Sequence, residues 1–520
     1  MVWNLLTHPI VRARFVDSTT VILSLPEVLE GLAADGVESF TALRPHQRHP
    51  WHALLCQLGA IACLRAGLDG PPSDATTWGD ILAALTPEFP DGEPWWLVSP
   101  PDRPAFLQPV TGPLSSLKPV SAPDELDMLV TAKNHDLKVA RMSDARPDDW
   151  LFALTSLQTF EGYLGAGNFG VSRMNGGFAN RPGISVAPPG GVGAHVMRDI
   201  RRLIELFDKL LDRHDEYDAD GLALLWLQPW DGSMTLPRKG LHPYYIENCR
   251  RVRLAEQDGA IRAFIGGSKV MRVTMTKEEG GITGDPWAPV RNEVEGQKVL
   301  TVDARGFDYR RLAEILAQQG YYPAPLQEFG DREGGQGWTL LCRALARGQG
   351  KTEGYHERRE RIPPGAQLRM KRGEYDLLGS IAQRRIAEAG AVRAALRLGL
   401  MTLFQNGPAR DAFSPRDPSS SRHAEPFLDR FQRLVDRDFV ESLFEEFAAG
   451  QGDIASKLRV EWLSELRRRA HRILKAADAG SPRSAVRHHR ALVRATAALD
   501  RGFYGAKELR DHFGEKRDVA

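Results

Sequence analysis

The 520-residue chain lacks the features that mark secreted, disulfide-stabilised or membrane-embedded proteins. Its four cysteines, at positions 56, 63, 249 and 342, include no C-x-x-C pair, which argues against a disulfide framework and against a cysteine zinc site. The first fifteen residues lack the apolar stretch of a signal peptide, and no apolar run approaches the length of a membrane span. We therefore expect a cytoplasmic protein with no membrane contact, no metal and no other cofactor.

The chain also lacks net charge. Its 68 Lys and Arg nearly balance 67 Asp and Glu, which leaves a formal charge of +1. A protein that binds nucleic acid over its whole surface is excluded, and any such surface must be a local basic patch. The length is sufficient for a large core and for two or more domains.

No convincing catalytic centre is visible. The nucleophile motif G-x-S-x-G is absent, and no Ser-His-Asp or Cys-His arrangement has a local anchor. Residues 133–136 (Lys-Asn-His-Asp) and the pair His488 and His489 invite a metal-nuclease interpretation. Neither has companion ligands at metal-site spacing, so a surface role is favoured for both.

Two glycine motifs resemble nucleotide-binding loops. Residues 165–170 fit G-x-G-x-x-G, but they follow a predicted helix, where a dinucleotide site needs a strand before the motif and a helix after it. Residues 350–352 match the end of a Walker A motif, but Leu345 stands where that motif needs glycine, and no long helix is predicted to follow. What remains is a Gly-Gln-Gly-Lys tip, which we expect to be flanked by a basic rim of Arg347, Arg358 and Arg359.

The first two-thirds of the chain mixes helices and strands without regular alternation. Apolar spacing predicts helices over residues 53–64, 151–164, 197–217 and 309–319. Asp258 and Gly259 predict the turn of a β-hairpin over 251–265, and 338–345 is predicted as a strand or short helix. Residues 115–148 are predicted to form a long, functional loop.

The pattern changes near residue 374, where proline thins out. Four amphipathic helices are predicted, over 374–405, 425–449, 455–478 and 481–501, and their mostly short connections favour an antiparallel bundle. The expected class is α+β: a mixed α/β domain over 1–365, then a four-helix bundle over 366–520. Residues 457–520 hold sixteen Lys and Arg against eight Asp and Glu, a local charge of +8. Such a field suits a polyanion, although a solvated helix face explains the charge equally well.

Taken together, several segments resemble the CasA family, the large subunits of type I-E CRISPR surveillance complexes (Cascade). The resemblance covers nearly the whole chain and depends on the order and spacing of short elements. These are residues 4–12, 103–108, 134–136, 165–177, 284–287 and 347–353, followed by the helical C-terminal region.

The resemblance implies a non-catalytic subunit that inspects the protospacer-adjacent motif (PAM) in double-stranded DNA, mainly from the minor groove. It further implies a wedge that opens the duplex, guidance of the displaced strand and recruitment of the helicase-nuclease. The resemblance implies that three elements contact DNA. They are a glycine loop (Gly165, Ala166, Gly167 and Asn168), a lysine (Lys277) and a glutamine-bearing wedge (Gln349, Gly350, Lys351 and Thr352). The loop that docks on guide RNA and other Cascade subunits includes Lys118, Lys133, Asn134, His135 and Lys138.

Some family members hold zinc through paired cysteines, which this chain lacks, so no zinc is expected. Asn168 stands where the family often has glycine. From the charge of the C-terminal region we expect Arg467, Arg468 and Arg472 to follow the displaced strand, though these three need not share a helix face. Two other function classes stay open: a metal- or nucleotide-dependent nuclease that uses 133–136 or 350–352, and a purely structural assembly subunit.

Overall fold

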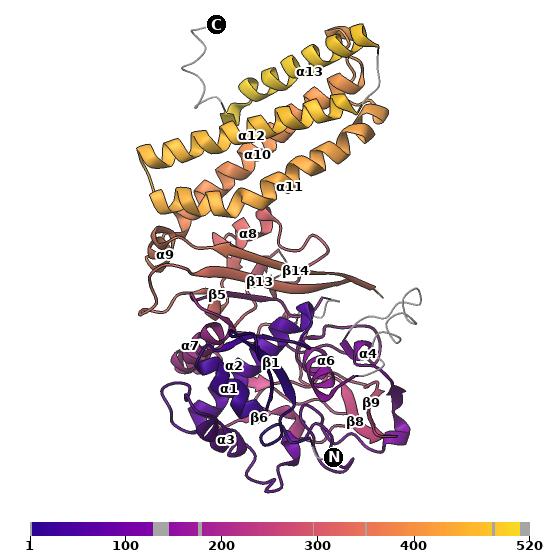
Figure 1. The fold of residues 1–520 in the computed structure, drawn as a ribbon, viewed down its shortest axis with the longest axis vertical. Helices are drawn as coiled ribbons and strands as arrows, with labels where there is room; N and C mark the ends of the chain where they lie inside the picture. The colour runs from indigo at the N-terminus through magenta and orange to yellow at the C-terminus, as the bar shows by residue number, and fades with distance from the viewer. Residues whose placement is uncertain are drawn as a thin grey trace. The chain divides into compact units, whose positions relative to one another are not determined.

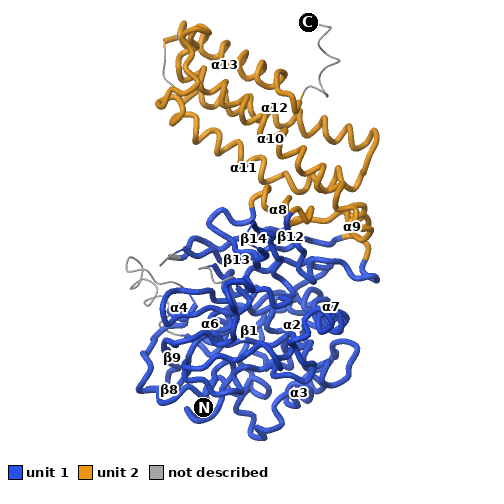
Figure 2. Tube along the Cα trace, turned by 180° about the vertical axis from the view of Figure 1, so that it is seen from behind, with its two compact units in different colours: residues 1–307, 320–333, 337–359 blue, residues 308–319, 334–336, 360–520 orange. Residues whose placement is uncertain are grey.

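The computed structural model describes residues 3–127, 145–174, 179–294, 296–348, 351–480 and 484–509, without the side chains of Lys351 and Ala485. The chain divides into two compact units, which Figure 2 colours separately. The first contains residues 1–307, 320–333 and 337–359; the second contains 308–319, 334–336 and 360–520. The domain boundary between residues 365 and 366 stays a proposal.

The helices of the first unit include one long buried helix, α2. Their bounds are α1 (Leu25–Ala33), α2 (Arg48–Arg65), α3 (Ala75–Ala83), α4 (Asp124–Asp127), α6 (Pro147–Phe160) and α7 (Val192–Arg213) (Figure 1). Helix α2 is buried from His49 to Cys63 and packs against α6 and α7, which confirms the core helix predicted over 53–64. Helix α7 buries Ile200, Leu203 and Phe207 at helical spacing, because its apolar stripe faces the core.

The strands of the first unit form small, mostly antiparallel sheets. The first sheet has the order β2 (Thr20–Leu23), β1 (Val11–Phe15), β3 (Val37–Phe40), and the second β11 (Gly296–Val299), β10 (Val290–Glu293), β12 (Tyr321–Tyr322). The third sheet has the order β14 (Lys351–Arg361), β13 (Thr339–Gly348), β5 (Gly183–Ala187). The fourth has the order β4 (Lys118–Val120), β9 (Ala260–Gly266), β8 (Arg251–Gln257). The fifth is a parallel pair, β6 (Leu222–Leu224) and β7 (Leu241–Ile246).

The β8–β9 hairpin confirms the one predicted over 251–265. Its turn residues Asp258 and Gly259 have φ of 53° and 75°. Two consecutive positive φ angles are what a two-residue hairpin turn requires, and Asp-Gly adopts them at low cost. Strand β13 likewise settles the alternative left open for 338–345 in favour of a strand.

The second unit is helical. Its helices are α8 (Tyr309–Leu316), α9 (Pro364–Lys371), α10 (Tyr375–Phe404), α11 (Pro418–Ala449), α12 (Asp453–Ala479) and α13 (Ala485–Gly505). Helix α10 packs along α11, α12 and α13, with Leu396, Leu443 and Leu466 among the side chains fully buried between them. The predicted four-helix bundle is therefore present, and fold class α+β is confirmed.

Several predicted elements have the wrong bounds, among them the helices predicted over 197–217 and 481–501, which are α7 and α13. Helix α11 begins at Pro418 rather than near 425, because Asp417 caps it by accepting the backbone N–H of Ser420 at 2.7 Å. Helix α6 begins at Pro147 and ends at Phe160, so residues 161–164 do not extend it to 164 as predicted. The predicted loop over 115–148 contains β4, α4 and the start of α6. Within the described residues, no helix is both long and apolar enough to cross a membrane.

Candidate nucleic-acid interface

The glycine loop that follows α6 is a tight backbone turn. Leu164 N–H donates to the Asn168 carbonyl, and Asn168 N–H donates to the Gly165 carbonyl, both at 2.9 Å. Gly165 and Gly167 have φ of +114° and +81°, a region that favours glycine. Ala166 and Asn168 are exposed, so the loop presents small side chains and backbone to its surroundings.

This loop lies against the residues that follow strand β9. The Ser268 N–H donates to the Gly167 carbonyl at 3.0 Å, and a Cβ added to Gly167 would lie 3.7 Å from the Cα of Gly267. The next residue, Lys269, is exposed and is held by its backbone N–H, which donates to the Gly232 carbonyl at 2.7 Å. The structure therefore places Lys269 beside the glycine loop. Sequence reasoning missed Lys269, because about a hundred residues separate the two segments.

Among the lysines named from the sequence, Lys118 lies near this loop. It does not belong to a long loop as predicted; it begins strand β4 and pairs with Ile265 of β9, three residues before Ser268. Lys277 is exposed on a turn in which Thr276 N–H donates to Glu279 at 2.6 Å. Among the contacts of the described residues, none joins Lys277 to the glycine loop, and its proposed role stays a prediction.

Strands β13 and β14 are neighbours in one sheet and are separated in sequence by Gln349 and Gly350. These two residues lie outside the described part of the chain, as does the Lys351 side chain; Thr352 lies on β14. A strand follows the Gly-Lys-Thr sequence, so no helix N-terminus is present to bind phosphate. This confirms the sequence argument against a Walker A site.

Arg347 does not contribute to a basic rim, contrary to expectation. It is buried, its Nη1 lies 2.8 Å from Oε1 of Glu161, and its Nη2 donates to the Asp127 carbonyl at 2.6 Å. Burial raises the pKa of Glu161, and the positive charges of Arg347 and Arg250 partly offset that increase. Glu161 also directly follows the last residue of α6 and stands four residues before Gly165. The ion pair therefore ties the end of β13 to the segment that carries the glycine loop.

The arginines of α12 line one surface hollow. Arg467, Arg468 and Arg472 share it with Ser464 and His471. The sequence left open whether these three arginines share a helix face, and in the structure all three line the same hollow. Each has an acidic partner: Arg467 lies 2.8 Å from Asp500, whereas Arg468 and Arg472 lie 2.7 and 2.8 Å from Glu465.

Arg468 and Arg472 are 68% and 70% exposed, so their pairing with Glu465 leaves them accessible to a polyanion. The docking residues Lys133, Asn134, His135 and Lys138 lie outside the described residues.

Comparison with known protein families identifies the family of this chain. The sequence model of the family described as CRISPR-associated protein Cse1 matches residues 4–473. The chain belongs to the Cse1 family. No curated protein matches the chain.

Several solved structures share the fold. A CasA from Thermus thermophilus is 17% identical, with a TM-score of 0.66 and coverage of 97% of this chain and 100% of that one. Cse1 from Acidimicrobium ferrooxidans is 16% identical, with a TM-score of 0.65 and coverage of 98% and 99%. A chain of a structure described as a CRISPR RNA-guided surveillance complex is 14% identical, with a TM-score of 0.61 and coverage of 96% and 99%. The resemblance to CasA seen in the sequence is thereby confirmed.

Proposed function

We propose that this chain is the non-catalytic large subunit of a type I-E CRISPR RNA-guided surveillance complex and that it recognises the PAM in double-stranded DNA. Membership of the Cse1 family supports this, and so does the likeness to a chain of a surveillance complex. The observation that carries the proposal is local. An exposed glycine loop, Gly165–Asn168, lies against a backbone segment that bears the exposed Lys269.

A glycine loop beside a lysine suits the minor groove. That groove distinguishes A·T from G·C pairs coarsely, so a permissive motif needs few specific donors. The backbone of Gly165 and Gly167 can approach a groove floor because no side chain intervenes, and Lys269 supplies a donor and a charge. Lys118, on the strand next to β9, adds a second exposed cation near this loop. Lys277 is kept as the alternative lysine.

The same proposal assigns Gln349, Gly350, Lys351 and Thr352 to a wedge that starts R-loop formation. Unstacking a base step costs a few kcal/mol, which contacts to the opened DNA must offset. The ion pair of Arg347 with Glu161 supports this role, since it anchors the end of β13 to the segment of the glycine loop. Sequence is then read by guide pairing rather than by this subunit.

The remaining parts of the proposal concern partners. Arg467, Arg468 and Arg472 would guide the displaced strand, and Lys133, Asn134, His135 and Lys138 would dock on guide RNA and other Cascade subunits. The bound subunit would then recruit the helicase-nuclease. We place this assembly in the cytoplasm and assign no catalysis to the chain.

The first experiment measures binding of the assembled complex to PAM and non-PAM duplexes. Lys269→Ala should weaken PAM discrimination, whereas Lys209→Ala, which removes an exposed lysine from α7, serves as the matched control and should not. If Lys277→Ala reduces discrimination and Lys269→Ala does not, the lysine is Lys277. If both leave discrimination at the parental value, the groove assignment is wrong.

The second experiment compares a closed duplex with a duplex already opened beside the PAM. Gln349→Ala with Gly350→Ala should impair binding to the closed duplex more than to the open one, because opening is the step that a wedge assists. Equal impairment on both would indicate simple contact with DNA. Cleavage of the duplex by the purified chain with ATP and a divalent metal would instead favour the nuclease alternative.

The third experiment addresses the arginines of α12. Replacing Arg468 and Arg472 by glutamine should lower the slope of log affinity against log salt by about one unit for each arginine that binds a phosphate, without changing PAM preference. An unchanged slope would mean that the displaced strand passes elsewhere.

A further inference from the structure

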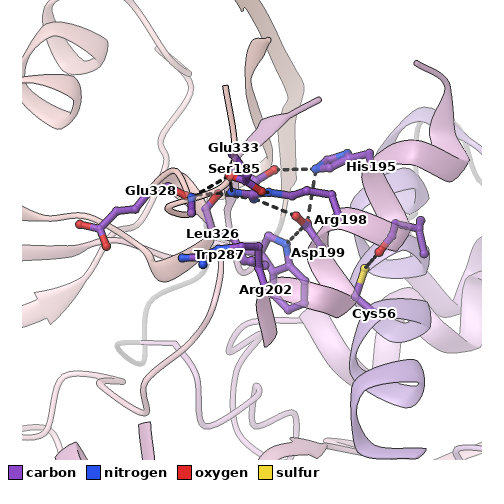
Figure 3. Close-up of polar contacts among 12 residues, drawn as sticks. Cys56, Ser185, His195, Arg198, Asp199, Arg202, Trp287, Leu326, Glu328 and Glu333 are labelled. Atoms are coloured by element: carbon purple, nitrogen blue, oxygen red, sulfur yellow. Dashed lines mark hydrogen bonds and ion pairs between the residues drawn. The ribbon is translucent and has the colours of Figure 1, made fainter. Parts of the chain in front are cut away.

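Two helices of the first unit carry potential metal ligands one turn apart on their facing sides. Helix α2 carries His52 and Cys56, and helix α7 carries His195 and Asp199. Residues four apart lie on the same helix face, the spacing at which helical histidines bind zinc. Because α2 packs against α7, these two pairs meet in the interior of the unit, where Figure 3 shows Cys56, His195 and Asp199.

Three of these side chains converge on one point. The Nε2 atoms of His52 and His195 lie 2.8 and 3.3 Å from the same carboxylate oxygen, Oδ2 of Asp199. The centroids of the two imidazole rings are 4.2 Å apart, and His52, His195 and Asp199 are all buried. Two ligand atoms that each lie about 2.0–2.2 Å from a tetrahedral zinc ion are roughly 3.3–3.6 Å apart, so the cluster needs small adjustments to hold one.

Hydrogen bonds account for part of this cluster. Oδ2 of Asp199 lies 2.8 Å from Nε2 of His52 and 3.3 Å from Nε1 of Trp287, two donors that its two lone pairs can accept. Nε2 of His195 lies 3.1 Å from Oγ of Ser185, so its hydrogen bond goes to the serine although the carboxylate is close. A cation between the two histidines and the carboxylate would use both imidazoles as acceptors, and Trp287 would keep its hydrogen bond.

The local charge also suits a cation. Arg198 Nη1 lies 3.0 Å from Oδ1 of Asp199, which leaves Oδ2 available, and its Nε lies 2.6 Å from Oε1 of Glu333. One arginine against two carboxylates gives this group a formal charge of −1. Arg343, whose positive charge lowers the pKa of His195, is itself paired with Glu357 at 3.0 Å.

The cluster has an access route. His52 and His195 form part of the wall of a cavity of about 490 Å³ within the first unit. An ion can enter by this cavity, and a water molecule in it can complete the coordination. Cys56 does not join the set in this geometry: its Sγ lies 3.6 Å from Nε2 of His52 and 3.8 Å from the Val196 carbonyl, to which it donates.

We propose that His52, His195 and Asp199 bind a divalent cation of the zinc class, which crosslinks α2 to α7. Three protein ligands and one water then surround the ion, and its role is structural. This site is independent of the proposed interaction with DNA. It departs from the sequence-based expectation of no metal, which considered paired cysteines and not histidines on two different helices.

The test uses the full chain, stripped with a chelator and then loaded with Zn²⁺ or Co²⁺. We expect one ion per chain by elemental analysis, visible d–d absorption from tetrahedral Co²⁺, and a higher Tm with Zn²⁺ than without it. His195→Gln and Asp199→Asn should each abolish the Co²⁺ absorption. Cys56→Ser should keep it.

A matched control is His46→Gln. The His46 side chain, 7% exposed, also lies on a carboxylate, with Nε2 2.7 Å from Oδ2 of Asp127, but no second histidine joins them among the described residues. This variant should keep full metal content. Absence of d–d absorption in the loaded parent chain would overturn the proposal whether or not the variants fold. So would retention of the ion by a folded His195→Gln protein.

Discussion

Replacement of Arg347 by methionine tests whether this arginine stabilises the fold or binds DNA. In the structure Arg347 and Glu161 are each 1% exposed at the side chain, and Nη1 lies 2.8 Å from Oε1. Methionine fills much of the same space but leaves the carboxylate buried without its partner. Removing one member of a buried ion pair costs about 3–5 kcal/mol, whereas an exposed arginine in a basic rim contributes within about 0.5 kcal/mol.

The sign of the pH dependence follows from the raised pKa of Glu161. An acid whose folded-state pKa is raised makes the folded state bind more protons, so stability falls as pH rises from the unfolded towards the folded pKa. Without Arg347 the folded pKa rises further, and this destabilisation extends to higher pH. The deficit of Arg347→Met should therefore be largest near pH 8 and smaller near pH 5.

The assay is urea unfolding followed by tryptophan fluorescence. All of the eleven tryptophans except Trp462 belong to the first unit, so the signal reports mainly on that unit. The double variant Arg347→Met with Glu161→Gln should recover most of the missing free energy of unfolding, because no buried charge is then left unpaired. A decrease below about 1 kcal/mol for Arg347→Met would refute the argument and return Arg347 to the basic rim.

Three further predictions address other parts of the chain. Gly170→Ala should prevent stable folding of the first unit, since its Cβ would lie 2.5 Å from the Gly162 backbone. Gly165→Ala has no atom within 4 Å of its added Cβ and should cost only the roughly 1–2 kcal/mol of a left-handed conformation. Thermal unfolding of the two variants tests the difference. Arg385→Met should destabilise the second unit by about 1–3 kcal/mol, because the buried Arg385 lies 2.7 Å from the buried Glu446, which keeps only Arg384 as a partner in the variant. The circular dichroism of its helices follows the unfolding, and an unchanged midpoint would contradict this. Burial opposes ionisation of Glu357, but the Tyr355 hydrogen bond and the charges of Arg343 and Arg359 prevail and lower its pKa to about 2. The stabilisation is present above the unfolded pKa of about 4.3 and is lost as pH falls towards 2, so Glu357→Gln should flatten stability over that window.

Local patterns in the sequence determined most of the elements. The apolar spacing of 53–64 and the Asp258-Gly259 pair each depend on neighbours within a few residues, and both predictions are confirmed. The bounds failed where a distant or capping interaction intervened. The Asp417 cap starts α11 early, and α6 ends at Phe160 because the backbone of Glu161 is extended.

The candidate sites depended on contacts between segments far apart in the chain. From the sequence, the glycine loop and the Gln349–Thr352 tip could be named, because the family resemblance lies in short motifs. The neighbours of the loop could not be named: Lys269 approaches Gly167 through a backbone hydrogen bond from Ser268, which has no side-chain signature.

The role of charged residues was misjudged from the sequence for the same reason. Arg347 resembles a surface cation in the sequence, yet its partner Glu161 is 186 residues away and the pair is buried. His52 and His195 each look like ordinary core residues of separate helices, and the packing of α2 on α7 is what aims both at Asp199. The sequence by itself determined the helices, the hairpin turn and the family. The tertiary structure decided which charges are paired and which side chains converge, since both depend on distances that folding alone creates.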